Sequence, residues 1–531
     1  MKLNNESLKN TDFWQKADIA LPRFDREKMI TATKAAPKWV HFGAGNIFRA
    51  FPAAMAQQLL EDGIETTGII VAEGYDSEII DKSFTNYDNL TILVTLKPDG
   101  STEKKVIASI ASSLKMDTEF DELKKIITEP SLQMASFTIT EKGYSLTGRD
   151  ATPFPDIAED LKTGPAANTP KSYLGRIAAL LHVRYLQGAL PLAMVSMDNC
   201  SHNGDILFAA MEAFAKSWVE NGTADAGFLN YVRDKSKVSF PWTMIDKITP
   251  RPDDSVRDML AAAGLEDMDG VVTKKQTYVA PFVNAEEPQY LVVEDAFPNG
   301  KPALEKAGVL FTDKETVDNV EKMKVCTCLN PLHTSLAVFG CILGYTRISE
   351  EMKNPFLVKL VEGVGYIEGL PVVTDPGIIK PRDFIDQVIK VRLPNPFMPD
   401  APQRIAMDTS LKIPIRFGET LKAYNNKCAD LKFIPLVLAG WLRYLLGIDD
   451  EGKPFEVNPD PNLEFLTTSL SGITLGQTGP FHDKLKPILS NPAYFGVNVY
   501  EVGLGEYVED LFTQMLAGPG AVREVLSKVC L

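Results

Sequence analysis

The stretch Trp39-Val-His-Phe-Gly-Ala-Gly-Asn-Ile-Phe-Arg49 is the first strong indication of the fold of this 531-residue chain. A short apolar segment leads into a Gly-x-Gly turn, and the following residues 50–60 have helical character. Pro52 falls in the first turns of that predicted helix, where a missing N–H costs little. A second apolar segment covers residues 67–73. Strand, glycine turn, helix and strand form the βαβ unit that opens a nucleotide-binding parallel sheet.

The α/β pattern continues beyond this unit and then gives way to helices. Strands are predicted at residues 136–140, 190–196 and 290–294, with a helix over 172–188. From about residue 312 the pattern is mainly helical, over residues 314–324, 334–343, 350–364, 382–391 and 434–446. The sequence therefore predicts an α/β protein with an extended Rossmann-type domain over residues 1–312 and a mainly α-helical domain over 313–531.

Composition narrows the class of partner and the compartment. A net charge of −15 argues against nucleic acid, because such binding needs a basic surface. No uninterrupted apolar run approaches the roughly 18 residues that a membrane helix needs. The polar start resembles no secretory signal. We therefore expect a cytoplasmic protein without a membrane or nucleic-acid partner.

Metal chemistry is not indicated by the cysteines or histidines. The six cysteines are scattered, and the Cys326-x-Cys328 pair has no second pair at zinc-finger spacing. The five histidines lack the HExxH spacing that places two ligands on one helix face. We expect no metal, and we interpret the two paired cysteines as small residues of the core or the site lining.

The glycine turn suggests a dinucleotide site. Gly43 and Gly45 allow the backbone to turn tightly and approach a pyrophosphate, although Phe48 replaces the third glycine of GxGxxG. Glu73 ends the second strand, where an acid can bind both ribose hydroxyls and repel a 2′-phosphate. This favours NAD over NADP. Asp76 is the alternative acid, and either acid can instead be a solvated loop residue.

The segment from Glu321 to Ala337 contains the richest group of reactive side chains. Lys324, Asn330 and His333 fall within ten residues of one another. In a hydride-transfer site a lysine can exchange the alcohol proton, an amide can stabilise the oxyanion, and a histidine can orient a hydroxyl. Taken alone, the segment also fits a helix with ordinary surface and core residues.

Six motifs together resemble the polyol-specific long-chain dehydrogenases, the mannitol dehydrogenase family. They appear in the order of the family and include its Lys…Asn-x-x-His signature. The segments are Gly43-Ala-Gly-Asn-Ile-Phe-Arg49, Thr138-Ile-Thr-Glu-Lys-Gly-Tyr144, Val195-Ser-Met-Asp-Asn-Cys-Ser-His-Asn-Gly204, Phe240-Pro-Trp-Thr-Met-Ile-Asp-Lys-Ile-Thr-Pro250, Lys324 to His333, and Arg404-Ile-Ala-Met-Asp-Thr-Ser-Leu-Lys412.

The resemblance implies a role for each matching residue. Lys324 is similar to the general base, Asn199 and Asn330 to the oxyanion pair, and His333 to the substrate-orienting imidazole. The remaining assignments are substrate binding for Asp246, Arg404 and Lys412, proton relay for Glu321, and cofactor binding for Gly43, Gly45, Asn46, Ile47, Arg49, Glu73, Thr140 and Glu141.

One spacing departs from the family. The asparagine commonly follows the lysine by five positions, whereas Asn330 follows Lys324 by six. At about 100° per residue, the extra position turns the asparagine away unless the helix carries a bulge. Lys322 is eight positions away and fits less well.

The resemblance implies reduction of a ketone by NADH, with Lys324 supplying the proton. Arg404 and Lys412 can bind a carboxylate, which favours a keto-uronate over an uncharged polyol. The segment from Cys326 to Tyr345 is most similar to the branch that interconverts fructuronate and mannonate; mannitol 2-dehydrogenase and tagaturonate reductase remain alternatives.

A catalytically idle NAD-binding regulator is an alternative of another class, although it would not need Lys324, Asn330 and His333. We expect a monomer or small homo-oligomer.

Overall fold

The computed structural model describes residues 1–165 and 169–531, apart from the side chain of Asn426. The chain forms two compact units. The first comprises Met1–Leu96 and Ser101–Asp318, and the second comprises Lys97–Gly100 and Asn319–Leu531. The units divide inside the helix α12 (Lys314–Met323).

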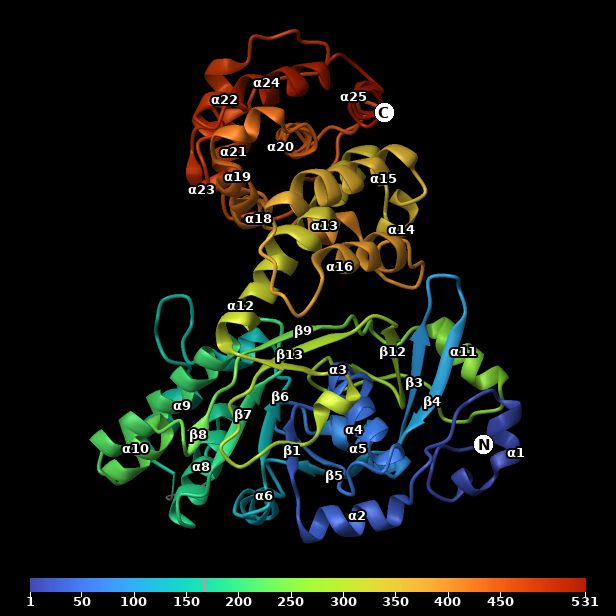
Figure 1. The fold of residues 1–531 in the computed structure, drawn as a ribbon, viewed down its shortest axis with the longest axis vertical. Coiled ribbons are helices and arrows are strands. Elements are labelled where there is room, and N and C mark those ends of the chain that lie inside the picture. Colours follow the sequence, from blue (N-terminus) through green and yellow to red (C-terminus); the bar gives the residue numbers. More distant parts are fainter. Residues whose placement is uncertain (166–168) are drawn as a thin grey trace. The chain divides into compact units, whose positions relative to one another are not determined.

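A six-stranded parallel sheet forms the centre of the first unit (Figure 1). Its strands, in spatial order, are β5 (Ile110–Lys115), β2 (Ile69–Glu73), β1 (Trp39–Phe42), β6 (Met134–Phe137), β7 (Leu192–Ser196) and β8 (Val238–Ser239). Counted along the chain within this sheet, the order is 3-2-1-4-5-6, that of the doubly wound dinucleotide-binding fold. The Rossmann-type prediction is therefore confirmed, together with the strands expected near residues 39, 67, 136 and 190.

Helices cover both faces of this sheet, and successive side chains along a strand point to opposite faces. Val40 and Phe42 of β1 pack into one apolar cluster, which includes residues of α6, α8, α9 and α10. Trp39 belongs to the cluster on the other face, with residues of α4. The bounds of these helices are α4 (Pro52–Glu61), α6 (Phe120–Ile127), α8 (Tyr173–Leu186), α9 (Asn203–Glu220) and α10 (Ala226–Arg233). Double coverage explains why the central strands are continuously apolar.

Smaller sheets and helices complete the first unit. One three-stranded sheet contains β12 (Phe282–Glu286), β3 (Thr91–Leu96) and β4 (Thr102–Ile107). A second contains β14 (Leu310–Thr312), β13 (Tyr290–Glu294) and β9 (Thr243–Asp246), and β10 (Val271–Val272) pairs with β11 (Tyr278–Val279). The strand predicted at 290–294 is confirmed. The remaining helices are α1 (Thr11–Lys16), α2 (Arg26–Ala35), α3 (Asn46–Ala50), α5 (Glu78–Ser83), α7 (Pro155–Thr163) and α11 (Asp254–Ala262).

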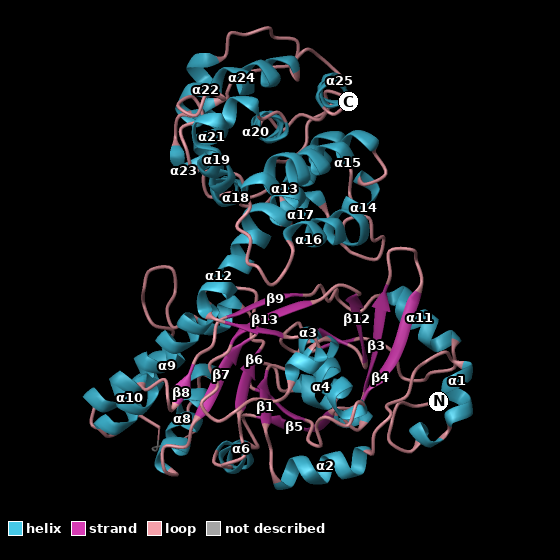
Figure 2. Ribbon diagram, in the orientation of Figure 1, coloured by secondary structure: helices cyan, strands magenta, loops and turns pink. Residues whose placement is uncertain are grey.

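The described second unit is helical, as Figure 2 shows. Its centre is the buried helix α13 (Asn330–Leu343), which contacts α15, α17, α18 and α20. Its other helices are α14 (Ile348–Glu351), α15 (Pro355–Glu362), α16 (Pro381–Gln387), α17 (Pro402–Ile405), α18 (Thr409–Arg416), α19 (Gly418–Tyr424), α20 (Phe433–Tyr444), α21 (Leu463–Ser469), α22 (His482–Leu489), α23 (Pro492–Phe495), α24 (Gly505–Gln514) and α25 (Ala521–Val529). The predicted helical domain is confirmed.

The helical run from Lys314 to Leu343 is interrupted once. Between α12 and α13 lies the π-helical segment η5 (Lys324–Cys328). By length and composition alone this run could cross a membrane, but 78% of its apolar window is buried inside the protein. Core helices of soluble proteins pass the same test, and this burial matches such a helix.

Candidate functional site

The glycine turn lies at the carboxyl end of β1, beside the end of β6. These neighbouring strands are where the strand order of the sheet reverses, the position at which such sheets bind ligands. Gly43 has φ +108°, and a Cβ there would lie 2.2 Å from the Thr138 carbonyl oxygen. A Cβ on Gly45 would meet no atom within 4 Å. Gly43 is therefore required by the turn, whereas Gly45 leaves open space beside the backbone.

Glu73 ties the end of β2 to this turn. Its Oε2 accepts a hydrogen bond from the Ala44 N–H at 2.9 Å. Its Oε1 accepts the N–H groups of Tyr75 and Asp76 at 2.7 and 3.1 Å. A carboxylate has about four acceptor positions, so three backbone contacts leave little capacity for a ribose. Asp76 is also buried and accepts from the Thr273 hydroxyl at 2.6 Å.

Arg49 is directed into the protein. Its guanidinium is fully buried and donates to the Ala280 carbonyl at 2.7 Å and to Asn46 Oδ1 at 2.9 Å. Burial lowers the pKa of Arg49 to about 9. Arg49 thus holds Asn46 at the start of α3, while Ile47 beside it is half-buried.

The turn after β6 has a strained backbone that a neighbouring carboxylate holds in place. Thr140 has φ 65° and ψ 158°, a region that normally requires glycine. Asp198 accepts the N–H groups of Ile139 and Thr140 at 2.8 and 3.0 Å and the Tyr144 hydroxyl at 2.7 Å. Burial raises the pKa of Asp198. Sequence reasoning missed this residue, although it precedes the predicted oxyanion residue in the same motif.

Three further predicted residues lie in the first unit. Asn199 follows β7 and is exposed, and Glu141 is exposed after the Thr140 turn. Asp246 ends β9, is buried, and stands opposite Tyr290 of β13.

The second unit contains the predicted proton-transfer group. Lys324 begins η5 with its side chain buried, whereas Lys322 is exposed. The Leu329 N–H donates to the Lys324 carbonyl oxygen at 3.0 Å, a contact across five residues. Asn330 then begins α13 and is half-buried, as is Glu321 in the last turn of α12. The six-residue spacing therefore coincides with a π-helical turn, the bulge that the spacing demanded.

His333 is held in a polar chain that sequence reasoning did not foresee. Its Nε2 lies 3.4 Å from Oδ2 of Asp400. Oδ1 of Asp400 accepts a hydrogen bond from Arg404, whose side chain is 65% exposed. Burial favours the neutral form of Asp400, but His333 and then Arg404 outweigh it and lower its pKa to about 2. Arg404, expected at the substrate, is thus engaged by Asp400.

The two cations of α18 differ in their contacts. The Lys412 ammonium donates to the carbonyl oxygens of Ile405, at 3.0 Å, and Met407. Burial and the positive charge of Arg416 lower the pKa of Lys412. Arg416, which sequence reasoning also missed, donates from Nη1 to the Thr334 hydroxyl at 2.6 Å. The Lys-x-Pro-x-Arg pattern after Thr409 was the available signal.

The Cys-x-Cys pair lies in η5, where burial disfavours the reactive thiolate form of both cysteines. Burial, together with the charge of Glu419, raises the pKa of Cys326 to about 11, and burial also raises the pKa of Cys328. All six cysteines are free. Within the described residues, no three His, Cys, Asp or Glu side chains form a group suited to a metal ion.

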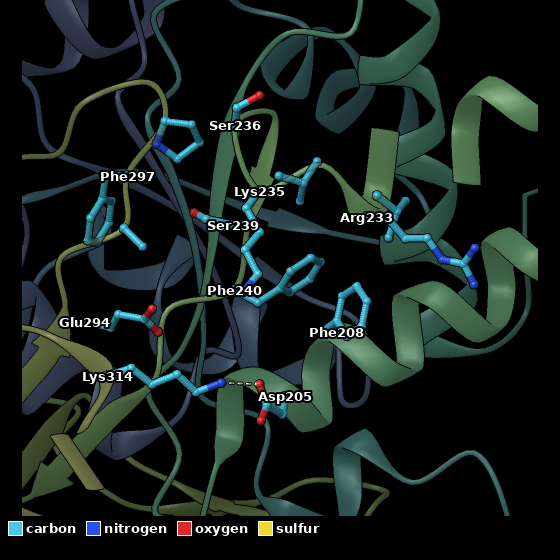
Figure 3. A pocket seen from close by; sticks show the side chains of 14 residues that line it. Asp205, Phe208, Arg233, Lys235, Ser236, Ser239, Phe240, Glu294, Phe297 and Lys314 are labelled. Carbon is cyan, nitrogen blue, oxygen red and sulfur yellow. Dashed lines mark hydrogen bonds and ion pairs between the residues drawn. The ribbon is translucent and has the colours of Figure 1, made fainter. Parts of the chain in front are cut away.

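A cavity of about 520 Å³ lies elsewhere in the first unit, beside the edge strand β8 (Figure 3). Phe208, Phe240 and Phe297 contribute aromatic walls, and Lys314 pairs with Asp205 at 2.9 Å. None of the predicted site residues lines this cavity.

Comparison with known proteins agrees with the fold of both units. Residues 37–306 match the mannitol dehydrogenase Rossmann domain, and residues 316–479 match the mannitol dehydrogenase C-terminal domain. The chain belongs to the mannitol dehydrogenase family. The resemblance inferred from the six motifs is thereby confirmed.

Members of the mannitol dehydrogenase family match this chain over nearly its full length. D-mannonate oxidoreductase of Thermotoga maritima is 52% identical, over 100% of this chain and 99% of the relative. Mannitol 2-dehydrogenase of Neosartorya fischeri is 29% identical over 93% of each chain. Among solved structures, Pseudomonas fluorescens mannitol 2-dehydrogenase, a ternary complex with NAD and D-mannitol, has a TM-score of 0.68 at 26% identity, covering 99% of both chains. A substrate-free D-sorbitol dehydrogenase, with a TM-score of 0.78 at 24% identity over 97% of this chain and 98% of that one, shares the fold.

Proposed function

We propose that this protein is an NAD-dependent oxidoreductase that reduces the ketone of D-fructuronate to the alcohol of D-mannonate, in hexuronate breakdown. The observation that carries the proposal is the 52% identity with a D-mannonate oxidoreductase over essentially the whole of both chains. The retained set Lys324, Asn330 and His333 supports an active enzyme over an idle regulator.

The cofactor assignment to residues 1–312 rests on the fit of the β1 end to a dinucleotide. Gly45 leaves space for a pyrophosphate to approach the backbone. Glu73 at the end of β2 and Asp76 just after it are two buried acids, and a 2′-phosphate would be repelled there. Asn46, Ile47, Thr140 and Glu141 belong to the turns around this position, and Arg49 holds Asn46 from behind. When bound, NADH supplies the hydride that the ketone carbon accepts.

Residues 313–531 contribute the proton chemistry. Lys324 donates a proton to the oxygen of the reduced carbonyl, and in the reverse direction its neutral amine removes it. The amide groups of Asn330 and Asn199 donate to the developing oxyanion. Glu321, one turn before Lys324, relays the proton towards solvent. Asp246 binds a substrate hydroxyl.

Asp400 serves as a positioning residue for His333. With Nε2 directed at Asp400, the imidazole can present Nδ1 to a substrate hydroxyl. Arg404 neutralises the far side of the carboxylate, which helps to keep Asp400 ionised.

The protein acts in the cytoplasm on a small sugar acid, as a monomer or a small homo-oligomer. Light scattering after size-exclusion chromatography tests the oligomeric state.

A substrate panel tests the proposed function. Fructuronate, tagaturonate and fructose are each supplied with NADH and with NADPH, and nucleotide oxidation is followed by the loss of the absorbance of reduced nicotinamide. We expect fructuronate with NADH to give by far the highest kcat/KM. Better use of fructose would make the protein a mannitol 2-dehydrogenase instead.

A further inference from the structure

Arg416 is a half-buried guanidinium with little to bind inside the protein. It is the last residue of α18, which packs against α13 and η5. Among the described residues its polar contact is the single hydrogen bond to the Thr334 hydroxyl, and no carboxylate forms an ion pair with it. A guanidinium carries five N–H donors, so most of its capacity is unused.

Two fully buried arginines of this chain each donate to several backbone carbonyls. Arg443 is fully buried and donates to the carbonyl oxygens of Met515, Ile448 and Asp449. Arg184 is also fully buried and donates to five carbonyl oxygens, those of Leu190, Ile127, Glu129, Leu132 and Pro191. Burying a charge without partners is costly. Arg416 makes one hydrogen bond by comparison, so its remaining donors are available to an anionic partner from outside the fold.

The position of Arg416 links it to the proposed substrate site. Its partner Thr334 directly follows His333 on α13, and Lys412 lies one turn earlier on α18. The two cations are close enough that the positive charge of Arg416 lowers the pKa of Lys412. An anion at this position would meet two positive groups.

The cations first expected to bind a carboxylate are engaged elsewhere. Arg404 pairs with Asp400, and the Lys412 ammonium donates to two backbone carbonyls. Arg416 is the member of this group whose donors remain available.

We propose that Arg416 binds the carboxylate of the sugar-acid substrate and thereby selects uronates over neutral ketoses. The inference rests on the proposed function for the identity of the substrate. The planar fork of a guanidinium can bind both carboxylate oxygens at once, whereas an ammonium acts as a point charge. A neutral ketose has a hydroxymethyl group in place of the carboxylate and gains nothing from this contact.

Two variants of Arg416 and a matched control test the inference. Arg416→Met removes the charge, and Arg416→Lys keeps the charge without the fork. Lys422→Met is the control, because Lys422 is an exposed cation on the neighbouring helix α19, paired with Glu419. With NADH, we expect Arg416→Met to lower kcat/KM for fructuronate roughly ten- to a hundredfold, mainly through KM. The fructose activity of Arg416→Met should stay near that of the parent protein. For fructuronate, the kcat/KM of Arg416→Lys should lie between the values of the parent protein and Arg416→Met.

Binding without turnover separates this inference from the proposed function. Calorimetry measures D-mannonate and the neutral D-mannitol with each NAD-loaded protein. If the parent protein fails to reduce fructuronate, the proposed function falls, while Arg416-dependent mannonate binding still supports the inference. If the parent protein reduces fructuronate and Arg416→Met leaves both mannonate affinity and selectivity unchanged, the inference is overturned. Equal loss for fructuronate and fructose would also overturn it, by making Arg416 structural. Should Arg416→Met fail to fold, Arg416→Lys decides by the same criteria.

Discussion

The Leu329 N–H donates a hydrogen bond to the Lys324 carbonyl oxygen at 3.0 Å, across five residues instead of the four of an α-helix. This π-helical turn takes up the extra residue between Lys324 and Asn330. Lys324, which begins this turn, is buried, whereas Lys322, two positions earlier in α12, is exposed. Single π-turns inside α-helices are frequent at functional sites. The geometry therefore favours Lys324 as the acid/base over Lys322.

Lys324→Ala should lower kcat by about two to four orders of magnitude, the usual contribution of a positioned proton-transfer group. NADH affinity should change little, because the proposed dinucleotide contacts come from the first unit. Steady-state kinetics and NADH fluorescence titration measure the two effects. Lys322→Ala is the control and should remain active. An essential Lys322 with a dispensable Lys324 would move the assignment by two positions.

Asp400→Asn should reduce kcat/KM about ten- to a hundredfold, because a charge-assisted contact is worth about 1.5–3 kcal/mol. The reason is loss of the carboxylate that orients His333. In a double-mutant cycle, the effect should vanish when His333→Gln is already present, since the imidazole is then absent. An undiminished effect in that background would show that Asp400 acts through the fold and not through His333. Asp383→Asn, at an exposed position of α16, is the control.

Glu73→Ala should raise KM for NADH and narrow the preference for NADH over NADPH. Its carboxylate holds the Ala44 N–H of the glycine turn and adds negative charge where a 2′-phosphate would lie. Comparing kcat/KM for both nucleotides measures the effect, and Asp76→Ala shows which acid dominates. A parent protein that prefers NADPH would contradict the assignment.

Glu351→Gln should stabilise the protein at neutral and alkaline pH. Glu351 is fully buried, both carboxyl oxygens lack a hydrogen-bond partner among the described residues, and burial raises its pKa well above the usual value. A raised folded pKa means that the native state holds the proton more tightly than the unfolded chain. The contribution of Glu351 to wild-type stability is therefore greatest below the unfolded pKa, about 4.3, and falls as pH rises.

Thermal unfolding from pH 4 to pH 8 checks this expectation. Glu351→Gln should unfold at a higher temperature than the wild type at pH 8, with the difference disappearing near pH 4. Glu350→Gln is the control, because Glu350 is exposed and pairs with Lys353 at 2.7 Å. A Glu351→Gln variant that is less stable than the wild type at pH 8 would contradict the predicted direction of the change in stability.

Local sequence patterns were sufficient for the fold class and for the candidate chemistry. Apolar runs of strand length, the Gly43 turn and helical periodicity after residue 312 reflect interactions between near neighbours in the chain. The motif order identified the family, and the extra residue before Asn330 indicated a bulge. These features depend on interactions between residues that are close along the chain, so they can be recognised from the sequence.

Which polar groups contact one another depends on the tertiary structure. Arg416 and Thr334 are 82 positions apart, and Ala44 and Glu73 are 29 apart. The Asp400 carboxylate lies outside α13 and contacts His333 of that helix. Asp400 also pairs with Arg404, which was expected to bind substrate. Such pairings depend on how α13, α18 and the strand ends pack, and no local pattern encodes that packing. Local patterns predict the elements and the reactive side chains, whereas packing sets their partners, because hydrogen bonds and ion pairs require contact in space and not proximity along the chain.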